Sequence, residues 1–355
     1  MQSAARQLAS RREPLEPARS PFGWQVEGTG VSRCRERVRL PAVTGLPVAD
    51  TTEQFAAIVA NEAALRPGVD RLCTMLGVDS GGLSRFANGS VPVYAAGELV
   101  LKLVPPVFLA EWRVEAGVLK AVSGSLPIPT PRLHAEGRRD GWGYLLMSRL
   151  PGVTLDSVWE QTTAANRDRL ADRLGETIAA LHQITQPRIP NWWPEDWPVF
   201  VAGQRARCVR EQRKLGLART WLEQYPAFLD RVPLRVGPPV LLHTEIMRQH
   251  LLVTEAPGGW HFSGLFDFEP AMPGSSEYEF ASVGVFVSQG DSRFLRRVLT
   301  AYGYPASVLG ADLSRRLLAW ALLHRYSNLA SWLRRLPEPS RPTLDALADR
   351  WFGTV

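Results

Sequence analysis

The sequence of 355 residues is poor in cysteine and has only Cys34, Cys73 and Cys208. They are odd in number, far apart and in no C-x-x-C pair, so neither a disulfide framework nor a zinc knuckle is supported. We expect three reduced thiols. The sequence also has no run of about 18 apolar residues, and its N-terminal residues lack the apolar core of a secretory signal. These absences predict a cytoplasmic protein with no membrane partner.

The net positive charge is small in the part of the chain that is expected to fold. Of the net charge of +6, residues 1–45 carry +4, which leaves +2 for the remaining 310 residues. A nucleic-acid-binding domain needs cations clustered on its folded surface, so we predict no nucleic-acid partner. Residues 1–45 are rich in Arg and Pro and are predicted to form a flexible leader.

Lysine is rare, with three residues against 38 arginines. One of the three, Lys102, lies in the apolar segment "ELVLKLV". A chain that otherwise uses Arg, yet keeps Lys in a strand, favours a site that needs a compact ammonium group. The alternative is a strand-edge lysine whose ammonium reaches water, and Lys102 alone does not decide between the two.

The sequence otherwise has an ordinary globular composition, with 45% hydrophobic and 21% charged residues. Hydrophobic periodicity predicts two short helices in residues 51–78, separated at Pro67, and then a hairpin in residues 84–105. A helix at 108–124 and two strands in 128–150 complete a β-β-α-β-β order. This order predicts a small antiparallel sheet with one helix packed on it.

The chain becomes mostly helical after residues 149–155. Helical periodicity covers 167–184, 203–230, 291–303 and 311–335. The strand-like segments between them are only "PVLLH" and "HFSGLFDFE". We therefore predict an α+β fold of two lobes, with the sheet in residues 46–150 and the helical lobe in residues 151–355.

Each strand-like segment of the second lobe is followed by an acid. Glu245 follows the first and Asp267 the second, and a turn through "TEAPGG" is expected to bring them together. Such a carboxylate pair can bind a divalent metal and accept a proton. Lys102, with Glu115 in the predicted helix after it, completes the residue set for phosphoryl transfer from ATP. No G-x-x-x-x-G-K-[ST] segment is present, so a P-loop does not compete.

Five motifs in the correct order resemble the aminoglycoside phosphotransferase family, from residue 50 to the C-terminus. They are "VLKL", "VEAGVLKAV", "YLLMSRLPGVTL", "IAALHQI" and "GLFDFEPAMPGSSEYEFA". Within the family, "GVTL" and G-x-S-x-Y-E-x-A are most similar to hygromycin B phosphotransferases. The resemblance implies a protein-kinase-like fold and a small-molecule kinase that uses ATP or GTP with Mg²⁺ or Mn²⁺. The implied acceptor is a hydroxyl of an aminoglycoside-like or other sugar- or amine-containing molecule, and we expect a monomer or a homodimer.

The resemblance also assigns roles to individual residues. It implies that Lys102 binds the phosphates with Glu115 as its partner, and that Asp267 binds the metal. It further implies nucleotide contacts from Ser90 and from the backbone of residues Met147 to Arg149 at the hinge between the lobes.

The catalytic loop departs from the family pattern H-G-D-x-x-x-x-N, because this chain has His243-Thr244-Glu245 and then His250. Glu245 is then the base that orients the acceptor hydroxyl. Its carboxylate lies one methylene further out, and a misplacement of about 1 Å can cost about a hundredfold in rate. His250 takes the metal-binding position of Asn, although imidazole suits ions softer than Mg²⁺. His243 keeps a structural hydrogen-bonding role, and Ser275 replaces an acid of the family.

The segment "WWPEDWPVF", residues 192–200, is interpreted either as a wedge between helices or as a wall of the acceptor site. In the second interpretation the acceptor contacts are Glu195, Asp196, Trp197 and Glu269. Glu277 could add negative charge there, whereas Glu279 is expected to cap or brace the helix that follows.

Other functions remain open at this point. The altered loop is consistent with a catalytically weak, kinase-like nucleotide-binding or regulatory protein. His243 and Glu245 also match a 2-His-1-carboxylate iron site of oxygenases, with His324 as the third ligand, although His324 lies in a long predicted helix. The H-x-E pattern of zinc deaminases is excluded because no cysteine follows Cys208.

Overall fold

The computed structural model describes residues 45–87 and 89–354. Nearly all of the predicted leader, residues 1–44, lies outside this part of the chain, as does Cys34. Within it, Cys73 and Cys208 are free and buried. None of the helices in the described ranges is long and apolar enough to cross a bilayer.

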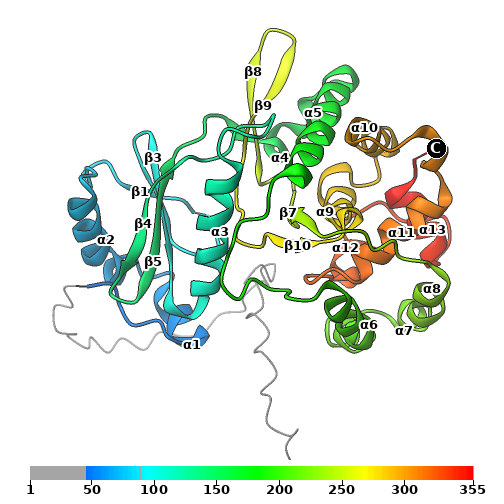
Figure 1. The fold of residues 1–355 in the computed structure, drawn as a ribbon, viewed down its shortest axis with the longest axis horizontal. Coiled ribbons are helices and arrows are strands. Elements are labelled where there is room, and N and C mark those ends of the chain that lie inside the picture. The colour runs from blue at the N-terminus through cyan, green and yellow to red at the C-terminus, as the bar shows by residue number, and fades with distance from the viewer. Residues whose placement is uncertain (1–44, 88, 355) are drawn as a thin grey trace, which may run out of the picture.

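The N-terminal lobe is built around a five-stranded antiparallel sheet with the order β1-β2-β3-β5-β4 (Figure 1). Its strands are β1 (Ser84–Arg85), β2 (Val93–Ala96), β3 (Leu99–Val104), β4 (Leu133–Arg139) and β5 (Trp142–Ser148). The predicted hairpin consists of β2 and β3, which turn at Gly97 with a φ of 59° that suits glycine. Side chains of β5 alternate between two hydrophobic cores, because successive residues of a strand point to opposite faces.

Three α-helices cover this sheet, namely α1 (Thr52–Ile58), α2 (Glu62–Leu76) and α3 (Leu109–Val122). The first two pack on the face that carries Trp142, and α3 packs on the opposite face, toward the C-terminal lobe (Figure 1). The predicted break at Pro67 is wrong, because the chain breaks at residues 59–61. There the side chain of Asn61 accepts a hydrogen bond from the N–H of Ala64 and starts α2.

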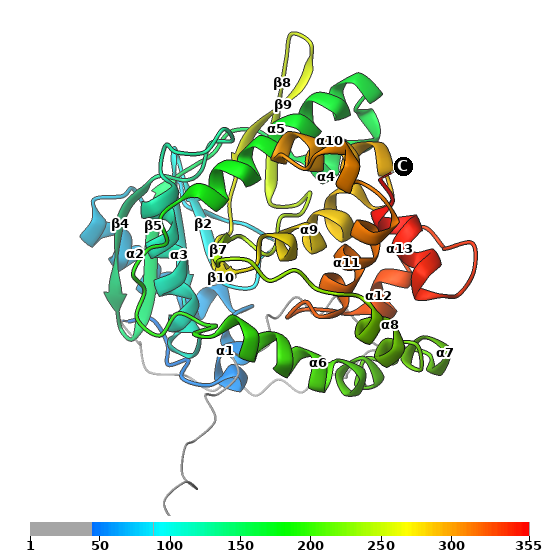
Figure 2. The ribbon, with the colours of Figure 1, turned by 45° about the vertical axis from the view of Figure 1, so that its right-hand side comes forward.

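The C-terminal lobe is mostly helical, as predicted (Figure 2). Its α-helices are α4 (Leu155–Val158), α5 (Ala164–Gln183), α6 (Trp197–Lys214), α7 (Arg219–Leu222), α8 (Tyr225–Arg231), α9 (Glu279–Ser282), α10 (Ser292–Tyr302), α11 (Ala311–Leu322), α12 (Leu329–Leu333) and α13 (Leu344–Phe352). The helix predicted at 203–230 is three helices, since α6 ends before Gly216, which has a φ of 80°. The helix predicted at 311–335 is two, because Asn328 caps a new helix, α12.

Two small sheets lie between these helices. Their strands are β6 (Val153–Thr154), β7 (Val240–Leu242), β8 (Leu251–Ala256), β9 (Gly259–Leu265) and β10 (Met272–Gly274). The sheets have the orders β6-β8-β9 and β10-β7. Strand β8 was not predicted, and the turn in "TEAPGG" joins β8 to β9 instead of β7 to β9. The loop from His243 to His250 therefore connects β7 to β8, and Asp267 follows β9.

The two lobes share hydrophobic packing. Leu145 and Met147 of β5 and Leu119 of α3 belong to the same buried cluster as α5 and α10 of the C-terminal lobe. Helices α5 and α10 lie side by side in both ribbon views (Figures 1 and 2). The predicted α+β organisation in two lobes is thus confirmed, and the segments with candidate functional residues lie where the lobes meet.

Candidate active site

The position of Lys102 follows from the pleat of β3. Leu101 and Leu103 are fully buried in the core on the side of α1 and α2, so Lys102 points to the other side, where α3 packs. Lys102 is 6% exposed, and its Nζ lies 2.7 Å from Oε2 of Glu115 on α3. The interpretation of Lys102 as a strand-edge residue is wrong, because β3 is an inner strand of the sheet.

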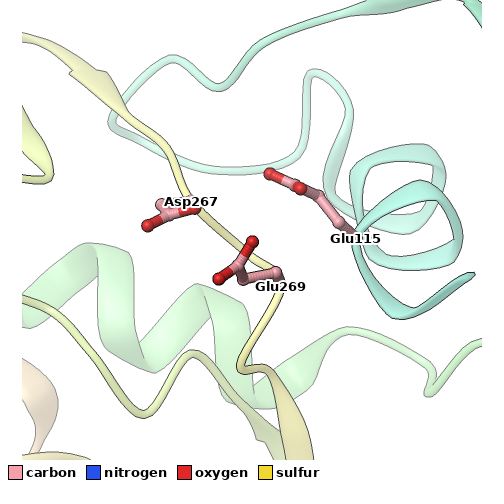
Figure 3. Close-up of side chains that lie close together, drawn as sticks. All are labelled: Glu115, Asp267 and Glu269. Carbon is pink, nitrogen blue, oxygen red and sulfur yellow. The ribbon is translucent and has the colours of Figure 1, made fainter. Parts of the chain in front are cut away.

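Two acids of the C-terminal lobe contact the same ammonium group. Lys102 Nζ is 2.8 Å from Oδ1 of Asp267 and 2.9 Å from Oε2 of Glu269. Figure 3 shows the carboxylates of Glu115, Asp267 and Glu269 gathered in one place, the first from α3 and the others from the segment after β9. The lobes are thus joined at a cation that three carboxylates surround.

The charges of this cluster shift one another strongly. Burial alone would lower the pKa of Lys102, but Asp267, Glu115 and Glu269 hold it well above its usual value. Burial also opposes ionisation of Asp267, yet Lys102 and His250 lower the pKa of this carboxyl below its usual range. For Glu115, burial exceeds the effect of Lys102 and, with repulsion from Asp267, raises the pKa to about 7. Lys102 and Asp267 are therefore charged near neutral pH.

His243 fixes the geometry of the loop that carries Glu245. The backbone N–H of Glu245 donates to Nδ1 of His243 at 3.3 Å, and Nε2 donates to the carbonyl of Phe266 at 3.0 Å. Burial lowers the pKa of His243, which favours this neutral form. His243 therefore ties Glu245 to the segment that leads into Asp267.

Glu279 holds the same loop through two hydrogen bonds to its backbone. It is fully buried, and its two carboxylate oxygens accept hydrogen bonds from the N–H groups of His243 at 2.7 Å and of Thr244 at 2.9 Å. Thr244 has a φ of 68°, a left-handed conformation that is costly for a β-branched residue. The sequence predicted a helix cap or brace for Glu279, whereas the structure shows a brace of the catalytic loop. The signal was present, because an acid within an apolar segment needs buried hydrogen-bond donors.

Glu245 is placed to accept a proton. It is 7% exposed, and burial, followed by repulsion from Asp267, raises its pKa to about 8, although Arg325 opposes the shift. A carboxyl group with a pKa near the pH of the surroundings can act as a general base.

His250 and Asp267 each place one possible metal-ligand atom close to the other. His250 Nδ1 donates to the backbone carbonyl of Glu245 at 2.9 Å, and its Nε2 lies 3.3 Å from Oδ2 of Asp267. An octahedral cation with bonds of about 2.1 Å holds neighbouring ligands about 3 Å apart, so this spacing fits a divalent metal. Carboxylate oxygens of Asp267, Glu269 and Glu115 also lie within 4.8 Å of one another.

The residues expected to contact the nucleotide lie in the N-terminal lobe. Ser90 is in the loop between β1 and β2, and Met147 is buried in β5. At the end of β5 the N–H of Ser148 donates to the carbonyl of Arg132 at 2.9 Å. The N–H of Arg149 donates to the carbonyl of Glu98 at 2.8 Å. These two N–H groups are therefore used within the lobe.

The position of Trp197 does not fit the interpretation of residues 192–200 as a wall of the acceptor site. Trp197 packs in the core against Tyr278 and Trp320, and Asp196 caps α6 by accepting from the N–H of Val199 at 2.8 Å. Glu195 is exposed. The interpretation as a wedge between helices fits Trp197, and Glu269 contacts Lys102 instead of this segment.

Glu277 is used in a buried ion pair of the C-terminal lobe. It forms a buried ion pair with Arg316, at 3.0 Å, and accepts from Nε1 of Trp320. Ser275, which replaces a family acid, donates to the carbonyl of Arg235. Neither side chain adds negative charge to the cluster around Lys102.

An aromatic and charged group beside Glu245 was not predicted. The guanidinium carbon of Arg325 lies 5.0 Å from the ring centre of Trp193 and 4.5 Å from that of Tyr326. Burial raises the pKa of Glu111 on α3 to about 7, as it raises that of Glu245, and Arg325 opposes both shifts, so both acids lie within its electrostatic reach. Segment 192–200 thus contributes an aromatic face through Trp193, which only the tertiary structure brings to Tyr326.

The iron-site alternative is wrong. His324 lies just after α11, its Nε2 contacts the carbonyl of Thr244 at 3.1 Å, and its Nδ1 accepts from the N–H of Tyr326. Both ring nitrogens of His243 are likewise used by backbone groups. In the described part of the chain, neither histidine therefore has a nitrogen available for a metal with Glu245.

Comparison with known proteins identifies a family for this arrangement. A family model described as "Phosphotransferase enzyme family" matches residues 85–320, which is more than half of the chain. The match includes the sheet with Lys102, the loop with Glu245 and the segment with Asp267.

Solved structures of aminoglycoside phosphotransferases have the same architecture. The GDP and kanamycin complex of APH(2″)-IIIa gives a TM-score of 0.59 at 16% identity, over 75% of this chain and 91% of that chain. The streptomycin-ATP-APH(2″)-IIa ternary complex gives 0.50 at 16%, over 76% and 95%. A thermostable mutant of APH(4)-Ia, in a ternary complex with AMP-PNP and hygromycin B, gives 0.50 at 18%, over 72% and 87%. At these identities the similarity shows the fold alone, and it confirms the predicted kinase-like fold.

Proposed function

Because the chain belongs to the phosphotransferase enzyme family, as its five motifs predicted, we propose that it transfers the γ-phosphate of ATP or GTP to a hydroxyl group of a small acceptor. The observation that carries this proposal is the position of Lys102, whose ammonium joins Glu115 of one lobe to Asp267 of the other. Phosphoryl transfer depends mainly on positioning the reactants and neutralising phosphate charge. A fixed cation beside an ionised metal ligand supports both.

In this proposal Lys102 binds phosphate oxygens, and Glu115 keeps its ammonium in place. Asp267 and His250 hold Mg²⁺ or Mn²⁺, which neutralises phosphate charge when it is bound. Ser90 contacts the nucleotide. Since the N–H groups of Ser148 and Arg149 are used within the lobe, we expect the base to contact carbonyl oxygens at the hinge, residues 147–149.

Glu245 orients the acceptor hydroxyl and takes its proton. The hydroxyl oxygen forms a bond to the γ-phosphorus as the bond from that phosphorus to the leaving oxygen breaks, which yields a phosphate ester and ADP or GDP. The backbone of Glu245 is held by His243 and His250. A carboxylate that is already fixed in place loses less entropy when the reactive geometry forms.

We propose an acceptor with sugar rings and amino groups. Trp193 and Tyr326 offer aromatic faces for a sugar ring or a cation. Burial raises the pKa of Glu111 to about 7, and a bound ammonium group would favour its ionised form. Similar structures contain kanamycin, streptomycin or hygromycin B, which are molecules with sugar rings and amino groups. We expect the protein to act in the cytoplasm, where ATP and GTP are available, as a monomer or a homodimer.

The test is an assay of the purified full-length chain with ATP or GTP, with Mg²⁺ or Mn²⁺, and with kanamycin, streptomycin or hygromycin B. We expect acceptor-dependent release of ADP or GDP and a mass gain of one phosphoryl group on the acceptor. Asp267→Ala and Glu245→Gln should abolish both signals. Glu223→Gln serves as a matched control, because this side chain is 59% exposed and pairs with Arg219.

Because the loop from His243 to His250 departs from the family pattern, the competing outcome is binding of nucleotide without phosphoryl transfer. If the chain binds nucleotide and metal but modifies no acceptor, it is a kinase-like nucleotide-binding protein and the proposed transfer is wrong. If it binds no nucleotide, with or without metal, the assignment of Lys102 to phosphate is wrong as well.

A further inference from the structure

A cavity lies in the C-terminal lobe, apart from the residues that contact Lys102. It has a volume of about 540 Å³, and its lining includes Trp159, Arg167, Arg248, Asp291 and Arg335. None of Glu115, Glu245, His250, Asp267 and Glu269 lines it. Three arginines face two acids there, Glu160 and Asp291, so the lining has a positive balance.

Arg248 is a buried cation of this cavity. It is 6% exposed, its Nε donates to the carbonyl of Val287 at 2.8 Å, and its guanidinium carbon lies 3.7 Å from the ring centre of Trp159. Within the described ranges, Arg248 has no ion pair with a carboxylate, and its two Nη groups make no hydrogen bond. Glu160 and Asp291 act on Arg248 only from a distance. A buried charge without a direct ion pair is costly, so an anion at these Nη groups would be stabilising.

Arg167 is fixed on the same wall. Its guanidinium carbon lies 4.4 Å from the ring centre of Trp159, its Nη2 donates to the carbonyl of Trp159 at 3.0 Å, and its Nε donates to Thr162 Oγ1 at 2.9 Å. Its Nη1 lies 3.8 Å from Oδ2 of Asp291. Two guanidinium groups are thus held against one tryptophan, and fixed guanidinium groups bind phosphate and carboxylate groups well.

We propose that this cavity binds a small molecule with a phosphate or carboxylate group, whose oxygens accept hydrogen bonds from Arg248 and Arg167. Arg248 lies in the catalytic loop, three residues after Glu245 and two before His250. Its backbone N–H donates to the carbonyl of Phe286 at 3.4 Å, and its carbonyl accepts from the N–H of Asp156 at 3.3 Å. An anion on its side chain therefore stabilises the loop that carries Glu245 and His250.

The test is a calorimetric titration of the full-length chain with inorganic phosphate and, separately, with citrate, in a buffer free of other polyvalent anions. Saturating ADP is present so that the nucleotide site is filled. We expect one of the two anions to bind and to raise the melting temperature. Arg248→Gln should weaken this binding by about tenfold or more, and Arg167→Gln should also weaken it.

Arg219→Gln is the matched control, because it removes the same charge from an 89% exposed site. Its dissociation constant should stay within about twofold of wild type. Equal affinities in Arg248→Gln and Arg219→Gln would overturn the proposal, as would displacement of the anion by kanamycin or hygromycin B. If Arg248→Gln does not fold by near-ultraviolet circular dichroism, the comparison of Arg167→Gln with Arg219→Gln decides the result. No step requires phosphoryl transfer, so this site is tested separately from the proposed activity.

Discussion

His250 stands where the family pattern has an asparagine, and its hydrogen bond decides what it can do. Because Nδ1 donates to the carbonyl of Glu245, Nε2 is the ring nitrogen that faces Oδ2 of Asp267, 3.3 Å away. A proton on Nε2, as in an ion pair with Asp267, or a metal cation bound to both atoms stabilises this approach. Imidazole binds Mn²⁺ better relative to Mg²⁺ than an amide oxygen does, so this substitution bears on metal preference.

We expect His250→Asn to reduce the preference for Mn²⁺ over Mg²⁺ by about tenfold. The measurement is the concentration of free Mn²⁺ by electron paramagnetic resonance, with Mg²⁺ as competitor and ADP present. His261→Asn is the control, since His261 is exposed on β9. An unchanged Mn²⁺ to Mg²⁺ ratio in His250→Asn would remove His250 from the metal site.

Glu245 should impose a pH dependence on the reaction. Burial and the charge of Asp267 raise the pKa of this carboxyl to about 8, and only the ionised form accepts a proton. We therefore expect kcat/KM to rise with pH, to reach half of its plateau near pH 8 and to level off about one pH unit higher. Glu245→Asp should keep a pH-dependent rate but lower it by about a hundredfold, because its carboxylate is displaced. A flat profile in wild type over this range would exclude Glu245 as the base.

At the scale of elements, the catalytic loop depends on the start of α9. Glu279 accepts hydrogen bonds from the backbone N–H groups of His243 and Thr244. Thr244 has a left-handed backbone conformation at this point of the loop. The side chain of Thr244 also donates to the carbonyl of Pro270. The strained turn is thus held by hydrogen bonds from other elements, as is common at functional sites.

Replacing Glu279 by Ala leaves two buried N–H donors unpaired, each worth about 1–3 kcal/mol. We expect the free energy of unfolding to fall by about 3 kcal/mol in urea titrations. Amide exchange at His243 and Thr244 should become faster than elsewhere in the lobe. Glu255→Ala is the control, since Glu255 is exposed on β8. A loss of stability without faster exchange in the loop would contradict the role of Glu279 as its brace.

The sequence allowed the main elements to be predicted, because periodicity reflects burial on one face. The sheet around Lys102 and helices α5 and α10 followed from it. Helix ends were missed where a side chain decides them, as at Asn61 and Asn328, which cap new helices. Strand β8 was missed although it pairs with β9 across the local turn in "TEAPGG", and only its pairing with β6 is made by distant parts of the chain.

The candidate site was predictable only in part, for the same reason. Motif order identified Lys102, Glu115 and Asp267, and the structure brings all three together. The contact of Glu269 with Lys102 and the position of Arg325 beside Trp193 depend on how distant segments pack. No local pattern in a single sequence encodes those distances.

At the scale of the whole molecule, Lys102 is the polar link between the lobes. Hydrophobic packing of α3 and β5 continues into the C-terminal lobe, and the ion pairs of Lys102 lie at this junction. Because the ammonium is buried among three carboxylates, its removal leaves unpaired negative charge in a desolvated place. Exposed lysine pairs have no such consequence, since water screens them.

This difference gives a direct test with two lysines of one chain. We expect Lys102→Met to lower the free energy of unfolding by about 3–5 kcal/mol near pH 8. Lys120→Met should change it by about 1 kcal/mol or less, because Lys120 is 58% exposed and pairs with Glu136 at the surface. Urea titrations of both variants measure the two effects.

The loss in Lys102→Met should also depend on pH in a definite direction. Lys102 lowers the pKa of Asp267 and partly restrains that of Glu115, so both values rise when the cation is removed. The folded variant then binds more protons than the unfolded chain, and its stability falls as pH rises through those raised values. The difference from wild type should therefore be largest near pH 8 and shrink toward about pH 5. A difference that is constant with pH would show that Lys102 stabilises the junction by packing and not by charge.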